Sequence, residues 1–145
     1  MWIDLGTGAG FPGLVVAALS GARVTMVESR KLRVDFLRRA AAVLDVQDRV
    51  EILCSKVETL EARPFDVISA RAFAPLEKLL NLGSRFSTEQ TRWILPKGRN
   101  AKTELEAAES LWQGDFKLEP SITDADAFII VAERVRPRSK GKSRR

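Results

Sequence analysis

The stretch WIDLGTGAGFPG, which runs from Trp2 to Gly13, decides the fold of this chain. It joins a short apolar run to four glycines and a proline. A strand followed at once by a glycine-rich turn and a helix is typical of the first unit of an open α/β sheet, where the turn holds a nucleotide or a related cofactor. The question is which cofactor this turn accommodates.

Two glycine patterns fit the stretch. Gly8, Gly10 and Gly13 satisfy G-x-G-x-x-G, in which the glycines allow a tight turn and close approach of a dinucleotide pyrophosphate. Asp4, Gly6, Gly8 and Gly10 satisfy D-x-G-x-G-x-G, in which an acid at the strand end precedes a loop around a methionine moiety and a ribose. The glycines alone leave both cofactors open.

The surrounding residues favour the second pattern. Leu5 is the last strand-like residue, and Gly6 follows it directly. Proline is preferred at the first position of a helix, so we predict that the helix begins at Pro12 and leaves the amides of 8–11 free to line a cofactor.

Alternation of apolar runs with helical patterns predicts repeated βα units, and hence an α/β fold with a mostly parallel sheet. The pattern predicts helices over 12–20, 31–44, 75–82 and 101–112, with Asn100 as an N-cap. The predicted strands are 2–5, 23–28, 49–53, 65–70 and 92–96. Two later runs, 116–119 and 127–135, are separated by too few residues for a crossover helix, so they predict an antiparallel hairpin at a sheet edge.

Length and composition indicate one domain, because 145 residues suffice for a single core. No apolar run is long enough to cross a membrane and no secretory signal is visible, so we expect a soluble, cytoplasmic protein that acts as a monomer and does not bind a membrane. The single cysteine, Cys54, is expected to be a small buried side chain.

The net charge of +5 is concentrated at the end of the chain. Seven of the 24 basic residues and none of the 19 acidic ones lie in 134–145, so the first 133 residues carry a net charge of −2. We therefore divide the chain into a domain over 1–135 and a disordered basic tail over 136–145. The tail is either a solubilising extension or an arm that binds phosphates.

Candidate ligand contacts follow the strand ends, where open α/β sheets bind ligands. Glu28 ends the second strand, and its carboxylate can accept both hydroxyls of a ribose. After the third strand, Val57 and Glu58 are either an adenine contact or an ordinary short helix.

Basic and aromatic residues follow the fourth and fifth strands. Arg71 can meet a cofactor carboxylate or an RNA phosphate, and Phe73 can stack on a base. Lys97 and Arg99 come after the fifth strand and suit a polyanionic substrate.

Histidine and tyrosine are both absent from the chain. Hydride transfer to or from an alcohol usually needs a proton-shuttling His, Tyr or Lys, whereas methylation of a ring nitrogen with a free lone pair needs no general base. The composition therefore favours methyl transfer without a catalytic base. With no histidine and one cysteine, we predict no metal site.

Five segments together resemble a known family. They are WIDLGTGAGFPGL, VESRKLRVDFLRR, SKVETL, FDVISARAFAPLEKLL and LPKGR, and they are similar to the bacterial 16S ribosomal RNA guanine-N7 methyltransferases, formerly called glucose-inhibited division protein B. The resemblance extends to about Val135, and the variation ISARA replaces the more usual T-S-R-A.

The resemblance implies a class I methyltransferase fold, Rossmann-like, with a seven-stranded sheet. It also implies S-adenosylmethionine as methyl donor, N7 of a guanine in the 530 loop of 16S rRNA as acceptor, and the rRNA or the 30S subunit as partner. The cofactor contacts that it implies are Gly6, Phe11, Val57, Glu58 and Arg71.

One departure concerns the N-terminus. Family members usually carry a further, largely helical segment ahead of the first strand, which would cover part of the cofactor site, and here Trp2 opens that strand. We therefore expect either a fragment or a shortened gene product. Two alternatives stay open at this point: an NAD(P)-binding oxidoreductase, and a non-catalytic RNA-binding module with a residual cofactor pocket.

Overall fold

The computed structural model describes residues 1–71 and 74–139 and contains a seven-stranded sheet with strand order β3-β2-β1-β4-β5-β7-β6. Five strands are parallel and the last two are antiparallel to their neighbours, as the sequence predicts. The strands are β1 (Trp2–Leu5), β2 (Val24–Glu28), β3 (Val50–Cys54), β4 (Val67–Ser69), β5 (Arg92–Lys97), β6 (Trp112–Pro120) and β7 (Phe128–Pro137).

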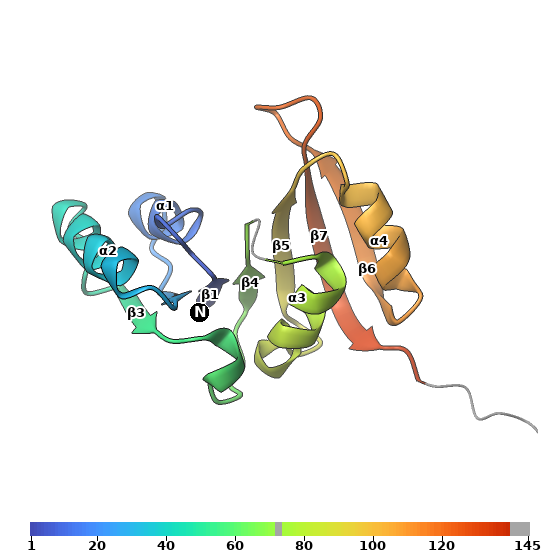
Figure 1. Ribbon diagram of the computed structural model, residues 1–145, viewed down its shortest axis with the longest axis horizontal. Coiled ribbons are helices and arrows are strands. Elements are labelled where there is room, and N and C mark those ends of the chain that lie inside the picture. Colours follow the sequence, from blue (N-terminus) through green and yellow to red (C-terminus); the bar gives the residue numbers. More distant parts are fainter. Residues whose placement is uncertain (72–73, 140–145) are drawn as a thin grey trace, which may run out of the picture.

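Four α-helices connect and cover the strands (Figure 1): α1 (Gly13–Leu19), α2 (Lys31–Val43), α3 (Leu76–Gly83) and α4 (Ala101–Glu109). In Figure 1, α1 and α2 lie beside β1 and β3 at one end of the molecule, and α3 and α4 lie beside β5, β6 and β7 at the other. Two short 3-10 helices, η1 (Val57–Thr59) and η2 (Ser84–Phe86), complete the connections.

Side chains that alternate along β1 and β2 build two separate cores, because successive residues of a strand point to opposite faces of the sheet. Met26 belongs to a cluster with the apolar side chains of α1 and α2, such as Leu14 and Leu37. Ile3 and Leu5 belong to a larger cluster with α3, α4 and the strands β4, β5 and β7. Asp4, between Ile3 and Leu5, therefore faces α1.

Most predicted boundaries agree with the structure to within two residues, and the largest differences are the end of the fourth helix and the start of β6, which begins at Trp112 and not at 116. The first helix begins at Gly13, directly after Pro12. The fourth helix ends at Glu109 rather than at Trp112, since Trp112 is the first residue of β6 and pairs with Pro137. Asn100 precedes α4 as predicted, but its side chain makes no capping hydrogen bond.

Strand β7 extends past the predicted domain boundary at residue 135. Arg136 and Pro137 pair with β6, and the backbone amide of Arg138 donates to the carbonyl of Leu111 at 2.8 Å. The first residues of the predicted tail are thus part of the sheet, whereas 140–145 lie outside the described residues.

Cys54 is exposed, so its predicted burial is wrong. It is the last residue of β3, which is an edge strand of the sheet. Among the helices that the structure describes, none is long and apolar enough to span a bilayer.

Candidate functional site

The glycine loop between β1 and α1 has a backbone that only glycine adopts freely. Gly6, Gly8 and Gly10 have φ angles of 62°, 59° and 96°, in the left-handed region that side chains disfavour. These are the three glycines of D-x-G-x-G-x-G. Gly13 has no such backbone, and it is required for a different reason, because a Cβ there would lie 2.8 Å from Met26 Cγ.

Asp4, on β1, is hydrogen-bonded to the glycine loop and to the start of α1. Its carboxylate is fully buried, and Oδ2 accepts hydrogen bonds from the Thr7 hydroxyl and from the Gly13 amide, the latter at 2.9 Å. Oδ1 accepts from the Ser69 hydroxyl on β4 at 2.8 Å. Burial raises the pKa of the Asp4 carboxyl above 3.8, while these three hydrogen bonds and the Arg71 charge act in the opposite direction. One acid thereby joins β1, the loop, α1 and β4.

Asp4 lines none of the described cavities near the loop. The sequence predicts it as a cofactor-binding residue, and the structure gives it contacts to the loop. Asp4 therefore contacts the loop and the start of α1, and its predicted role as a cofactor contact stays a prediction.

Glu28 ends β2 directly beneath the loop. Its side chain is 6% exposed, and its two oxygens accept hydrogen bonds from the backbone amides of Gly8, at 3.1 Å, and Arg30, at 2.9 Å. Arg33 on α2 is the nearest cation, with 3.7 Å between its Nη1 and Glu28 Oε1. Each carboxylate oxygen has two acceptor positions, so both oxygens retain capacity to accept a hydroxyl of a ligand.

Glu28 lies in the wall of a 530 Å³ cavity at the carboxyl ends of β2 and β3. Gly6 forms one side of this cavity, and Val57 and Glu58 of η1 form another. Val57 is 3% exposed and belongs to the larger core cluster, whereas Glu58 is exposed, which is the arrangement expected of the ordinary short helix that the sequence left open. The structure thus brings together four of the residues predicted to contact the cofactor, namely Gly6, Glu28, Val57 and Glu58.

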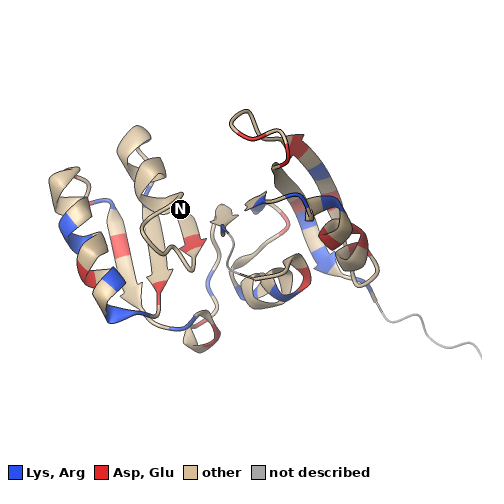
Figure 2. Ribbon diagram, turned by 45° about the horizontal axis from the view of Figure 1, so that its top comes forward, with Lys and Arg blue, Asp and Glu red and all other residues tan. Residues whose placement is uncertain are grey.

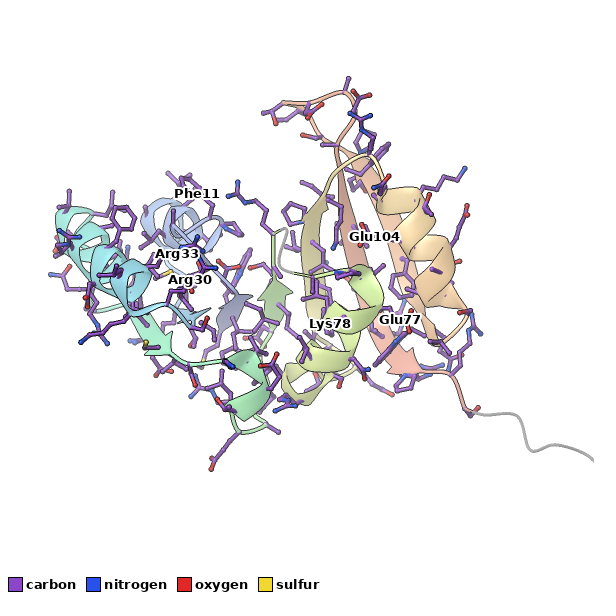
Figure 3. All side chains as sticks on the ribbon, in the orientation of Figure 1. Phe11, Arg30, Arg33, Glu77, Lys78 and Glu104 are labelled. Atoms are coloured by element: carbon purple, nitrogen blue, oxygen red, sulfur yellow. The ribbon has the colours of Figure 1, made fainter. Side chains whose placement is uncertain are left out.

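A second cavity, of 610 Å³, lies over the loop itself and shares Gly6 and Arg33 with the first. Phe11 and Arg71 line it, and the Arg71 guanidinium carbon lies 5.5 Å above the centre of the Phe11 ring. Figure 3 shows Phe11, Arg30 and Arg33 gathered around the loop and the start of α2. Half of the Phe11 side chain remains exposed.

Arg71 also lines a third cavity, of 760 Å³, at the carboxyl ends of β4 and β5. The opposite wall of this cavity comes from the loop between β6 and β7, including Ser121 and Asp124. The three cavities therefore follow one edge of the sheet, and Arg71 belongs to both the second and the third.

The remaining predicted substrate contacts differ in their surroundings. Lys97 lines the third cavity, but its side chain is 6% exposed and its ammonium is hydrogen-bonded to Ala74 O and to Glu104. Arg99 is exposed in the turn before α4. Phe73 lies outside the described residues, so its predicted stacking on a base stays a prediction.

Several residues of the site are missed by reasoning from sequence. Thr7 and Ser69 hold Asp4, but hydroxyl residues near a glycine loop are too common to be singled out. Arg33 belongs to no recognisable motif, and it lies near Glu28 only because it is on the first turn of α2. Glu104, on α4, accepts a hydrogen bond from the amide of Leu76, which begins α3 and is distant from it in sequence. Among the described residues, no group of His, Cys, Asp and Glu side chains is arranged to hold a metal ion.

The fold matches solved methyltransferases. Geranyl diphosphate C-methyltransferase from Streptomyces coelicolor superimposes with a TM-score of 0.73 over 92% of this chain and 72% of that one, at 16% sequence identity. At this identity the likeness concerns the fold alone. It confirms the predicted Rossmann-like fold of class I methyltransferases.

Curated relatives are much closer in sequence. Ribosomal RNA small subunit methyltransferase G of Rhizorhabdus wittichii is 58% identical over 99% of this chain, and that of Zymomonas mobilis is 50% identical over 96%. The chain spans 67% and 62% of the lengths of these two relatives. The family model described as GidB, rRNA small subunit methyltransferase G, matches residues 1–127. The chain therefore belongs to the rRNA small subunit methyltransferase G family, as its motifs predict.

Proposed function

We propose that this chain is the catalytic domain of an S-adenosylmethionine-dependent rRNA methyltransferase that modifies N7 of a guanine in the 530 loop of 16S rRNA. The observation that carries the proposal is the site at the end of β1 and β2. There, Gly6, Gly8 and Gly10 have left-handed backbone, and the buried Glu28 and the apolar Val57 line adjoining cavities. The chain that carries this site belongs to the rRNA small subunit methyltransferase G family.

The residues present fit the cofactor. Glu28 offers two acceptor oxygens for the ribose hydroxyls, and Val57 offers an apolar surface for the adenine ring, with Glu58 at its polar edge. The loop from Gly6 to Gly10 presents backbone to the second cavity, where the methionine part would lie. When bound, S-adenosylmethionine supplies a methyl group on a positively charged sulfur.

In the reaction, the residues of this chain would position the cofactor and the guanine base and exclude water from between them. Guanine N7 carries a free lone pair, so none of the residues has to remove a proton before transfer. Arg71 lies between the cofactor cavities and the third cavity, where it can contact the cofactor carboxylate or an adjacent phosphate of the RNA. The third cavity is large enough for a nucleobase, and the exposed Arg99 follows Gly98, which lines that cavity, so Arg99 can meet a phosphate of the RNA.

We place the enzyme in the cytoplasm, acting as a monomer on 16S rRNA or on the 30S subunit that contains it. The basic residues 140–145 would add electrostatic attraction to this polyanion. Figure 2 shows basic and acidic residues at both ends of the sheet, with basic residues along α2. A shorter chain that lacks 140–145 should bind RNA with a smaller salt dependence, and an unchanged salt dependence would remove the tail from the proposal.

The first test is calorimetric titration with S-adenosylmethionine and with NADH. We expect binding of S-adenosylmethionine alone, and a protein that binds NADH instead would be an oxidoreductase. Glu28→Gln should weaken S-adenosylmethionine binding about 10-fold to 100-fold, since a hydrogen bond to a charged group contributes ~1.5–3 kcal/mol. Glu119→Gln, an exposed acid on β6, is the matched control and should bind as the unmodified protein does.

The second test is transfer of a labelled methyl group to 16S rRNA and to 30S subunits. The label should appear as 7-methylguanine in a fragment that contains the 530 loop, and Arg71→Ala should abolish most of the incorporation. A folded protein that binds S-adenosylmethionine and RNA but never transfers the methyl group would instead be the non-catalytic RNA-binding module.

A further inference from the structure

We propose that Lys97 and Glu104 form an internal ion pair whose task is to position the segment that carries Arg71. In this view Lys97 is a positioning residue and not a contact to RNA phosphate. The inference rests on the proposed function only in the role given to Arg71. The ion pair itself is a property of the described structure.

The contacts of Lys97 are internal. Its side chain extends from the end of β5 and is 6% exposed, and its ammonium donates to the carbonyl of Ala74 at 2.7 Å and to Glu104 Oε1 at 3.2 Å. An ammonium has three donors, and two of them are used inside the protein. A phosphate that took Lys97 would leave the partly buried Glu104 carboxylate without its cation, which is costly in a site of low dielectric.

Glu104 completes the connection. The same oxygen that accepts from Lys97 also accepts from the backbone amide of Leu76 at 2.9 Å. Leu76 is the first residue of α3, so this amide has no partner within its own helix. Glu104 lies between α3 and α4 in Figure 3. The pair thus joins three separate elements: the end of β5, the first turn of α4, and the start of α3.

Both anchored groups belong to the segment that follows β4. Ala74 and Leu76 come three and five residues after Arg71, and Ala74, Lys97, Glu104 and Arg71 all line the third cavity. On the side of the second cavity, the Arg71 guanidinium lies over the half-exposed Phe11 ring. The Lys97–Glu104 pair therefore holds the chain three and five residues after Arg71, which lines both the second and the third cavity.

The geometry makes two variants informative. Lys97→Met keeps most of the length of the side chain and removes the charge and the donors, whereas Lys97→Arg keeps both. Lys102→Met is the matched control, because Lys102 is an exposed lysine on the same helix as Glu104. Glu104→Gln keeps an oxygen that can accept from Leu76 and removes the charge.

The test reads the state of Arg71 directly. We would record the Nε–Hε resonance of Arg71 by NMR, identified through its loss in Arg71→Lys. Lys97→Met should shift this resonance toward the position of a solvent-exposed arginine, with Glu104→Gln causing a smaller shift in the same direction and Lys102→Met causing none. An Arg71 resonance that is unchanged in Lys97→Met, in a protein whose unfolding is still cooperative, would overturn the inference whether or not the chain transfers methyl groups.

A double-mutant cycle gives the second readout. If Lys97 acts through Arg71, Lys97→Met and Arg71→Ala should each weaken S-adenosylmethionine binding by roughly 10-fold, and the double variant should be no weaker than Arg71→Ala alone. Lys97→Arg should restore most of the affinity. Effects that multiply in the double variant would show that Lys97 acts independently of Arg71 and would refute the positioning role. If the unmodified protein does not bind S-adenosylmethionine at all, the proposed function is refuted. The NMR measurement would still show whether the Lys97–Glu104 pair positions Arg71.

Discussion

Replacing Gly13 by alanine should destabilise this protein, although Gly→Ala within a helix usually stabilises. A Cβ on Gly13 would lie 2.8 Å from Met26 Cγ, 2.9 Å from Met26 Sδ and 2.9 Å from Asp4 Oδ2. Met26 and Asp4 are both fully buried, so neither can move aside without disturbing its neighbours. The new methyl group must therefore push α1 away from β1 and β2.

The magnitude follows from three effects. Better helix propensity favours alanine by at most about 1 kcal/mol. Overpacking of a buried site costs about 1–3 kcal/mol. The hydrogen bond from the Gly13 amide to Asp4 Oδ2, now 2.9 Å, would lengthen, and a hydrogen bond to a charged group contributes ~1.5–3 kcal/mol. Even partial loss of that bond leaves a net destabilisation of about 1–3 kcal/mol.

Urea denaturation followed by tryptophan fluorescence measures this change. Gly21→Ala is the control, because a Cβ at Gly21 would meet nothing within 4 Å and the backbone there is not left-handed. That variant should be unchanged or more stable by about 0.4–1 kcal/mol. If Gly13→Ala unfolds at the same urea concentration as Gly21→Ala, with the same dependence on denaturant, the close packing of α1 against Asp4 and Met26 is refuted.

Three further predictions concern other parts of the molecule. Burial raises the pKa of Asp4. Its contribution to folding is therefore fully present below about pH 3.9, the pKa of an unfolded aspartate, and is lost as pH rises through its folded pKa. The unfolding free energy of Asp4→Asn relative to that of the unmodified protein should increase as pH rises from about 4 through the folded pKa, and urea titrations that show the opposite trend would contradict this. Trp93 is fully buried, and its indole nitrogen has no hydrogen-bond partner among the described residues, so Trp93→Phe should cost well below the ~3–5 kcal/mol of a Trp→Ala change, as thermal unfolding of both variants would test. The amide of Arg138 donates to Leu111 O, and its guanidinium donates to Glu109 O at 2.6 Å. A chain that ends at 139 should therefore keep its stability, whereas a chain that ends at 135 should lose several backbone and side-chain hydrogen bonds, ~0.5–1.5 kcal/mol each. Equal melting temperatures of the two chains would place the end of the domain at 135.

The strands and the mostly parallel character of the sheet were accessible from sequence because the signals are local. A four-residue apolar run before Gly6, and similar runs ending at Glu28 and Cys54, alternate with helical patterns, and βα alternation leaves few topologies. The short polar connection between β6 and β7 predicted the antiparallel pairing for the same reason. Trp112 was placed in a helix because its strand partner, Pro137, is distant in sequence.

The connections between side chains were harder to predict. The residue types at Asp4 and Glu28 indicated a cofactor site, but nothing local shows that Asp4 turns inward to the loop and Glu28 toward a cavity. Lys97 illustrates the limit most clearly. Its place at the end of the fifth strand predicted a contact to a polyanionic substrate, whereas in the structure its ammonium pairs with Glu104 on α4. A pairing of this kind depends on how a strand and a helix pack against each other, and the hydrophobic periodicity of the sequence does not predict that packing.

The support that Asp4 gives the glycine loop has a thermodynamic consequence. Since Thr7, Gly13 and Ser69 already fix this carboxylate, the loop loses its conformational entropy when the chain folds and not when a ligand arrives. Ligand binding should therefore show little ordering of the loop. The same connection makes the site sensitive to local opening: moderate denaturant that releases α1 from Asp4 would empty the site while the other half of the sheet, with α3 and α4, is still folded.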